Sequence, residues 1–222
     1  MMCASAVFAG LTESECLEIA SCARARTFAR DELLFMQGQP SSSLVMLHGG
    51  SVKQTQISSN GAEVIIQMSG KGEPLASTAG CLPCNHTCSA RAMEKCNASV
   101  WEYARLQDLL KKYPQIGINI SRILSGRLDE LQERFREVAT EKVAQRLARA
   151  LLRLMKQVGK PSKGGVEISL NREELAQMTG TTLFTISRLL SKWGEEGFVL
   201  PCREAVVVLD SQRLVKVSVA DE

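Results

Sequence analysis

Residues 171–193 read NREELAQMTGTTLFTISRLLSKW and carry the clearest local pattern in the chain. Asn171 is a preferred helix N-cap residue, and Glu174, three positions later, can complete a capping box. Gly180 suits a tight turn after this first helix, because a residue without a Cβ atom adopts positive φ easily. The pattern predicts two short helices joined by a tight turn.

The second predicted helix has an inward and an outward side. Thr181 or Thr182 can cap it, and Ile186, Leu189 and Leu190 recur at helical spacing on its inward side. The positions left at its N-terminal end or on its outward side are Thr182, Leu183, Phe184, Thr185, Ser187 and Arg188.

This helix pair has two interpretations. In a helix-turn-helix, the N-terminal end of the second helix meets base edges in the major groove of double-stranded DNA. The Arg188 guanidinium can donate two parallel hydrogen bonds to guanine O6 and N7, and the threonine and serine hydroxyls can donate to phosphates. The alternative is an ordinary helical pair with a solvated polar face. The coincidence of cap, turn glycine and basic outward side favours DNA binding.

Residues 27–101 contain several short, separate apolar runs. Asn60-Gly61 is the clearest hairpin turn between them, because both residues tolerate positive φ. A capping box at Thr12 and Glu15 predicts a short helix before them. The spacing predicts a small antiparallel β-roll or barrel. The apolar runs are Leu33–Met36, Leu44–Leu47, Val64–Met68 and Val100–Tyr103.

A long helix is predicted after Pro114. Apolar residues recur every three or four positions from Ile116 to Val138, over about six turns without a turn signal. A small β-roll cannot cover so long a stripe, so a second copy of the chain is the expected partner. The alternative is packing within one chain. The residues expected at the dimer interface are Ile120, Leu124, Leu128, Leu131 and Phe135.

Together with the remaining segments, the predicted elements indicate the α+β fold class. A further helix is expected over residues 140–158, and residues 159–165 (GKPSKGG) read as a loop. Phe198–Pro201 and Val206–Leu209 read as a short hairpin after the last helix.

Composition and charge narrow the class of protein. The chain is 45% hydrophobic and 23% charged, as globular proteins are. Its net charge of +3 lies in residues 140–222, which hold 13 Lys and Arg against 10 Asp and Glu, and this suits a nucleic-acid partner. No apolar run approaches the roughly 18 residues of a bilayer span. The first eleven residues lack the basic start of a secretory signal, so we expect a cytoplasmic protein without a membrane partner.

Several segments occur in the order and spacing of one known family. They are Leu33–Gly38 (LLFMQG), Leu47–Lys53 (LHGGSVK), Gly61–Ile66, Gly72-Glu73, the helix after Tyr113-Pro114, Thr185–Leu190 (TISRLL) and Gly197-Phe198-Val199 through Asp210 to Leu214. With them the chain, from Leu11 to its end, resembles the Crp/Fnr superfamily of bacterial transcription regulators.

This resemblance implies a fold and a function. The implied domains are a cyclic-nucleotide-binding-like β-roll sensor over residues 1–113, a dimerisation helix over 114–139 and a winged helix-turn-helix over 140–222. The implied function is transcription regulation by a homodimer on a palindromic DNA site, with RNA polymerase as a further candidate partner.

The chain departs from the family pattern at two places. Recognition helices of the family usually carry a glutamate where this chain has Phe184. A carboxylate accepts from cytosine N4, whereas an aromatic ring can only contact a thymine methyl group or pack internally. The family's cyclic-nucleotide binders also carry an Arg-Ser-Ala or Arg-Thr-Ala triplet where this chain has Cys88-Ser89-Ala90. A cyclic phosphate would lose its guanidinium partner, so cyclic AMP is not the expected effector.

Four of the eight cysteines fall within 16 residues, at Cys81, Cys84, Cys88 and Cys96. The first two lie in C-x2-C spacing on one tight turn, Cys88 can be a third ligand, and Cys96 or His86 a fourth. Spacing alone does not separate zinc from iron–sulfur. We favour an oxygen-labile [4Fe–4S] cluster, because a sensor needs a group that changes state. The alternatives are zinc, a thiol–disulfide switch, and no cofactor.

Two further alternatives remain open. His48 and His86 are candidate haem ligands, although a lone histidine is more often a surface or hydrogen-bonded residue. A cysteine-based oxidoreductase would need a base beside Cys84, which only His86 can supply, and the chain has no glycine-rich cofactor loop. We therefore expect a regulator with a redox, gas or small-molecule signal rather than an enzyme.

Overall fold

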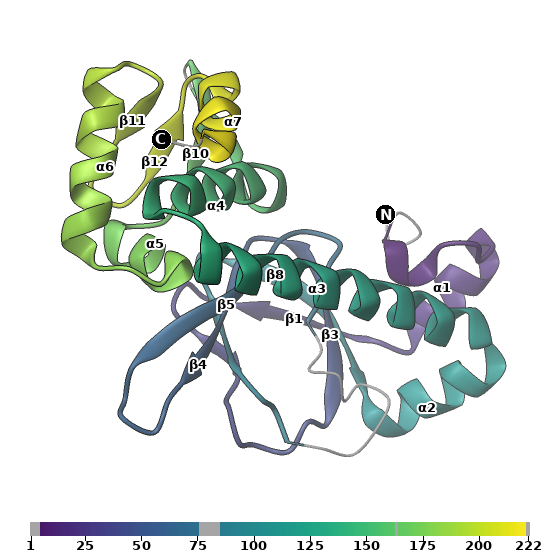
Figure 1. Cartoon of the computed structure of the whole chain (residues 1–222). Coiled ribbons are helices and arrows are strands. Elements are labelled where there is room, and N and C mark those ends of the chain that lie inside the picture. The colour runs from purple at the N-terminus through teal and green to yellow at the C-terminus, as the bar shows by residue number, and fades with distance from the viewer. Residues whose placement is uncertain (1–4, 76–84, 163, 221–222) are drawn as a thin grey trace. The chain divides into compact units, whose positions relative to one another are not determined.

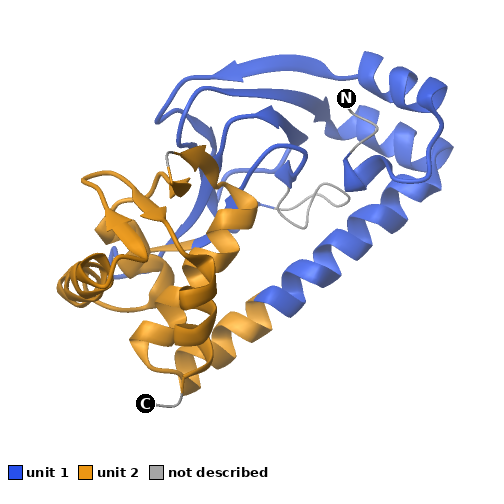
Figure 2. Cartoon of the chain, turned by 90° about the horizontal axis from the view of Figure 1, so that it is seen from above, with its two compact units in different colours: residues 1–62, 66–130 blue, residues 63–65, 131–222 orange. Residues whose placement is uncertain are grey.

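Figure 1 shows the computed structural model of the chain, which describes residues 5–75, 85–162 and 164–220. The chain forms two compact units, residues 1–62 with 66–130 and residues 63–65 with 131–222 (Figure 2). The units divide within the long helix α3 (Pro114–Thr140), between residues 130 and 131.

The first unit contains two four-stranded sheets. One has the order β1 (Arg24–Phe28), β8 (Cys96–Glu102), β3 (Ser43–Gly49) and β6 (Pro74–Leu75). The other has the order β2 (Leu33–Phe35), β7 (Ser89–Ala92), β4 (Val52–Ile57) and β5 (Glu63–Ser69). Side chains from both sheets, including Phe28, Leu47 and Val52, form one buried cluster. The predicted β-roll is confirmed.

The β4–β5 hairpin turns where the sequence predicts it. Gly61 has a φ of 83°, and the Ser58 amide donates to the Ala62 carbonyl at 2.9 Å. Asn60 does not adopt positive φ; its side-chain oxygen accepts from the Ala62 amide at 3.2 Å. The loop therefore places one residue in the left-handed region, where the Asn-Gly pattern allows two.

Helices α1 (Glu13–Ser21) and α2 (Tyr103–Lys112) belong to the same unit. The predicted capping box of α1 is present, and Thr12 Oγ1 accepts from the Glu15 amide at 3.3 Å. The Trp101 indole is buried and donates to the Ile19 carbonyl at 2.9 Å, which ties α1 to β8. The sequence reading missed α2, whose first residue was expected to end a strand.

The first half of α3 completes the core of this unit, which corrects part of the predicted dimer interface. Ile116 and Ile120 are buried in the cluster around Trp101, and Leu124 is partly buried against it. Steps of four residues advance about 400° around a helix, so each step drifts about 40°. Steps of three residues turn the stripe back by about 60°, so Leu131 and Val138 lie within about 20° of Ile120 around the helix, and the stripe extends past the cluster around Trp101. Its later members, which are exposed, are Leu128, Leu131, Phe135 and Val138.

The second unit contains the predicted helix-turn-helix and a small sheet. Its helices are α4 (Val143–Gln157), α5 (Arg172–Thr179), α6 (Leu183–Glu195) and α7 (Ser211–Val219). Its sheet has the order β11 (Val199–Pro201), β12 (Val206–Val208), β10 (Gly165–Ile168) and β9 (Lys160–Ser162). The predicted wing hairpin is the β11–β12 pair, so the winged helix-turn-helix is confirmed.

Two elements of this unit differ from the sequence reading. Residues 160–162, expected within a loop, form the edge strand β9, and an edge strand tolerates Pro161 because its outer side needs no ladder donor. The helix α7 was not predicted. Asp210 caps it by accepting from the amides of Gln212 and Arg213.

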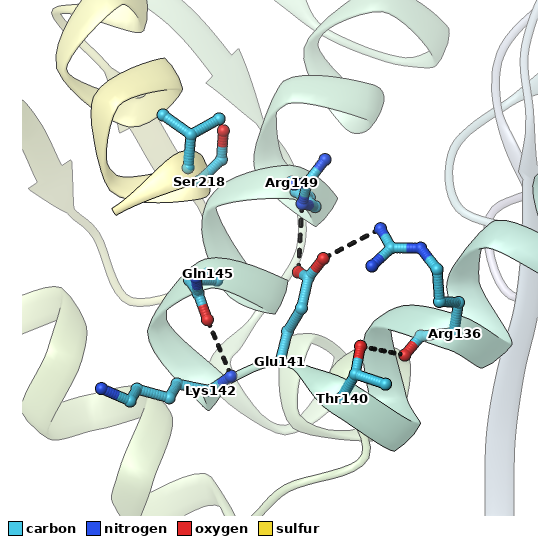
Figure 3. A pocket seen from close by; sticks show the side chains of 8 residues that line it. Arg136, Thr140, Glu141, Lys142, Gln145, Arg149 and Ser218 are labelled. Carbon is cyan, nitrogen blue, oxygen red and sulfur yellow. Dashed lines mark hydrogen bonds and ion pairs between the residues drawn. The ribbon is translucent and has the colours of Figure 1, made fainter. Parts of the chain in front are cut away.

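Ion pairs join α3 to α4 within the second unit. Glu137 is 3% exposed, and Arg153 donates to both of its carboxylate oxygens at 2.5 and 2.9 Å. Figure 3 shows the neighbouring pocket, where Glu141 lies between Arg136 and Arg149 at 2.9 and 3.0 Å. These contacts fix the angle between the end of α3 and the start of α4.

The substitution Arg153→Met would leave the buried Glu137 carboxylate without its two guanidinium donors. We expect the free energy of unfolding to fall by about 3–5 kcal/mol, measured by urea denaturation. The double variant Glu137→Leu/Arg153→Met replaces the pair by apolar side chains and should recover most of that loss. An equal loss in the single and double variants would contradict this account.

Candidate nucleic-acid interface and effector site

The predicted capping box and turn of the helix-turn-helix are present. Asn171 Oδ1 accepts from the Glu174 amide, and Glu174 Oε2 accepts from the Asn171 amide, both at 3.0 Å. Gly180 ends α5 in the left-handed conformation, with a φ of 61°. A side chain with a Cβ would be strained at this position, so the glycine sets the direction in which the chain enters α6.

Thr182, rather than Thr181, caps α6. Its Oγ1 accepts from the Thr185 amide at 3.2 Å, and the two hydroxyls lie 3.0 Å apart. Ile186, Leu190 and Trp193 form the buried side of the helix. This burial orients α6, because residues halfway round the helix from Ile186 must face away from the core.

The six predicted DNA contacts lie at the N-terminal end of α6 or along its first two turns. Thr182 and Arg188 are exposed, and Thr185 and Ser187 are half-buried. Leu183 and Phe184 are 51% and 75% exposed, so neither is part of the hydrophobic core. The helix thus presents one guanidinium, several hydroxyls and two large apolar side chains together.

A second candidate site is a group of polar residues in the first unit, which we call the interior polar cluster. Gln54 donates to Ser69 at 3.2 Å, and the Cys88 thiol donates to Gln54 at 3.5 Å. Arg127, from α3, donates to the Pro74 carbonyl at 2.7 Å. The cluster consists of Gln54, Ser69, Glu73, Cys88 and Arg127.

The charged members of the cluster affect each other's ionisation. Burial raises the pKa of the Glu73 carboxyl, while a hydrogen bond with Ser69 and the charge of Arg127 act in the opposite direction. Burial likewise lowers the pKa of Arg127, against the influence of Glu73. The resemblance had drawn attention to Glu73, but the sequence reading missed Arg127. From the sequence, a charged residue within an apolar stripe is expected to face solvent unless its angular position around the helix is worked out.

The structure does not bring Cys88 and Cys96, two of the four predicted cysteine ligands, together. Cys81 and Cys84 lie outside the described residues. Cys88 directly precedes β7, whereas Cys96 begins β8 and its thiol donates to the Ser51 carbonyl at 3.3 Å. The four residues of β7, about 13 Å of strand, separate the two positions. Both thiols are buried, so Cys88 and Cys96 do not fit one metal centre in this arrangement.

Within the described ranges, no group of three or more His, Cys, Asp or Glu residues could hold a metal ion. The predicted haem ligands also have other contacts. His48 Nε2 lies 2.7 Å from Ser99 Oγ, and the His86 ring is buried and stacked on Phe35 with ring centres 4.0 Å apart. Haem ligation by His86 would have to displace this stacking.

Comparisons with known proteins identify the class. Residues 25–113 match the family model described as a cyclic nucleotide-binding domain, and residues 145–217 match that of the Crp-like helix-turn-helix domain. A β-roll joined by a long helix to a winged helix-turn-helix defines a DNA-binding transcription regulator. The chain belongs to the Crp/Fnr superfamily.

Relatives match over most of the chain. It is 23% identical over 212 residues to the CRP-like cAMP-activated global transcriptional regulator of Mycobacterium tuberculosis, covering 95% of both chains. It is 24% identical over 193 residues to the transcriptional activator protein anr of Pseudomonas aeruginosa, covering 86% of this chain and 79% of the relative.

Solved structures share the fold. That of the c-di-GMP responsive global regulator CLP of Xanthomonas campestris matches with a TM-score of 0.77 and 22% identity, over 90% of this chain and all of the other. Among the helices that the structure describes, none has the length and apolar character needed to cross a bilayer.

The pKa of Glu73 leads to a pH-dependent stability. Because its folded-state pKa is raised, the native state binds more protons than the unfolded state between the ordinary and the raised pKa. The free energy of unfolding of the wild type should therefore fall, relative to that of Glu73→Gln, as the pH rises through this window, and the difference should be constant above it. Urea denaturation at several pH values measures this.

The matched control for this measurement is Glu195→Gln, which makes the same change at an exposed position on α6. It should show no such window. A difference between wild type and Glu73→Gln that does not vary with pH would contradict the burial of the Glu73 carboxyl.

Proposed function

We propose that the chain binds a palindromic DNA site as a homodimer, with the outward side of α6 in the major groove. The observation that carries this proposal is the exposed, partly basic N-terminal half of α6, held in a capped helix-turn-helix. Arg188 would donate to guanine O6 and N7, and the hydroxyls of Thr182, Thr185 and Ser187 would contact phosphates. Such a regulator works in the cytoplasm, where the DNA is accessible, and RNA polymerase is a candidate partner at the promoter.

The proposed dimer forms along the second half of α3. Leu128 and Leu131 are 54% and 55% exposed, and Phe135 and Val138 are 75% and 50% exposed. Apolar side chains repeated at this spacing leave a stripe that water solvates poorly. A second copy of α3 would cover it, and a two-fold dimer would place two recognition helices on two half-sites. Of the interface predicted from the sequence, Ile120 belongs instead to the core of its own chain.

The interior polar cluster is our proposed effector site. Two of the similar proteins named above respond to cyclic nucleotides, being called cAMP-activated and c-di-GMP responsive. This chain lacks their family's arginine triplet, but Arg127 supplies a guanidinium beside Glu73. A small molecule with one anionic group and hydroxyl groups would suit this pair of charges. Because Arg127 lies on α3, its engagement would bias the helix that leads to the DNA-binding domain.

The iron–sulfur hypothesis stays a prediction. A [4Fe–4S] cluster on Cys81, Cys84, Cys88 and Cys96 would require Cys88 and Cys96 to leave their buried hydrogen bonds. Zinc, haem and a thiol switch also stay open as signals. Iron, sulfide and zinc analysis of protein purified without oxygen, with its absorption spectrum, separates these chemistries.

The substitution Arg188→Ala tests the DNA-binding face. A lost bidentate guanine contact costs about 1–3 kcal/mol per half-site, so a symmetric dimer should lose at least roughly 30-fold in affinity for an operator selected from random duplexes. Fluorescence anisotropy measures this. Lys216→Ala removes the same charge from α7 and should change the affinity little. Unchanged operator affinity in folded Arg188→Ala would rule out Arg188 as a base contact.

The substitution Leu128→Glu tests the dimer. A carboxylate in the apolar stripe would be desolvated without a partner, so we expect a monomer with weak DNA binding, measured by analytical ultracentrifugation. Ile118→Glu places the same charge on an exposed apolar position of α3 outside the stripe and should leave the dimer intact. A dimeric Leu128→Glu variant would show that the stripe is not the interface.

A further inference from the structure

Phe184 is an exposed aromatic residue at the N-terminal end of α6. It is the second residue of the helix and 75% exposed, so the internal packing that the sequence left open does not occur. Its neighbour Leu183 is also half-exposed. Single apolar residues on a surface need no explanation, but two adjacent ones at the end of a recognition helix leave an apolar spot where DNA would dock.

The rotation of the helix places Phe184 beside Arg188. Ile186 is fully buried, and residues two positions away from it lie about 200° around the helix. Phe184 precedes Ile186 by two residues and Arg188 follows it by two. Both side chains therefore leave the face opposite the core, and they are neighbours because they are four residues apart. Phe184 therefore lies one helical turn from Arg188 and near whatever base Arg188 meets.

The chemistry of the ring restricts what it can recognise. A phenyl ring has no hydrogen-bond donor or acceptor, so it can bind neither a phosphate nor the polar edge of a base. In the major groove, the C5-methyl group of thymine is the apolar feature of the base pairs. Opposite a cytosine or a purine, the ring would remove water from polar atoms without replacing their hydrogen bonds.

We propose that Phe184 reads a thymine in each half-site by packing on its C5-methyl group. This inference rests on the proposed function and adds a specificity-determining residue to it. One helical turn rises about 5.4 Å and one base pair about 3.4 Å, so the thymine lies within about two base pairs of the guanine bound by Arg188.

The test removes only the methyl group. An operator is selected from random duplexes with the wild-type protein, and each thymine is then replaced by deoxyuridine, which keeps the base pairing. At the thymine read by Phe184, burial of one methyl group predicts a loss of about 4-fold per half-site and about 15-fold when both half-sites are changed. At thymines outside the reach of α6, the replacement should change nothing.

The variant Phe184→Ala removes the ring and is measured on the same two kinds of duplex. It should bind the thymine and deoxyuridine duplexes equally, and its urea midpoint should match the wild type because the side chain is exposed. Phe184→Glu, selected against the same random duplexes, should exchange the thymine preference for cytosine, because a carboxylate accepts from cytosine N4.

Each other outcome has a definite meaning. If the wild type binds both duplexes equally, or if Phe184→Ala still discriminates between them, the assignment of Phe184 is overturned. Equal binding by the wild type is also the result expected of a ring that wedges between bases without touching a methyl group. If the wild type selects no sequence at all, the proposed function itself fails.

Discussion

One helix of 27 residues, α3, has to present different side chains to different neighbours as it turns. Its first turns bury Ile116 and Ile120 around Trp101, and the next bring Arg127 to the Pro74 carbonyl. Its last turns place Glu137 against Arg153 of α4. The helical repeat of 3.6 residues fixes which residue faces which neighbour. A change at Arg127 can therefore act on α4 through a continuous hydrogen-bonded helix, provided that the helix has two arrangements to choose between.

The elements that sequence reasoning predicted well are those with local signals. The capping boxes at Thr12 and Asn171, the turn at Gly61 and the left-handed Gly180 depend on a few consecutive residues, and each is present. The strand β9 could not be read in this way, because a lysine, a proline and a serine have low strand preference and form a strand only where β10 offers an edge. The apolar stripe of α3 was read as one interface, whereas its first turns pack in the core around Trp101 and its later turns are exposed.

In the candidate sites, too, features with local sequence signals could be predicted and features that depend on distant residues could not. The inward and outward sides of α6 follow from helical periodicity, so the exposed position of Arg188 could be foreseen, whereas internal packing of Phe184 was left open. The cysteine spacing did not show that β7, an extended strand, lies between Cys88 and Cys96. The charge influence of Arg127 on Glu73 joins residues far apart in the sequence, and only the fold brings Arg127 to the Pro74 carbonyl next to Glu73.

The exposed stripe on α3 has a consequence for how the regulator responds to its own abundance. Leu128, Leu131, Phe135 and Val138 offer a narrow, single-helix contact for the proposed dimer. If that contact dissociates at cellular concentrations, mass action makes the amount of dimer rise with the square of the chain concentration. Occupancy of a two-fold operator would then respond more steeply than in proportion to synthesis of the chain, so a modest change in expression would act as a signal alongside any effector.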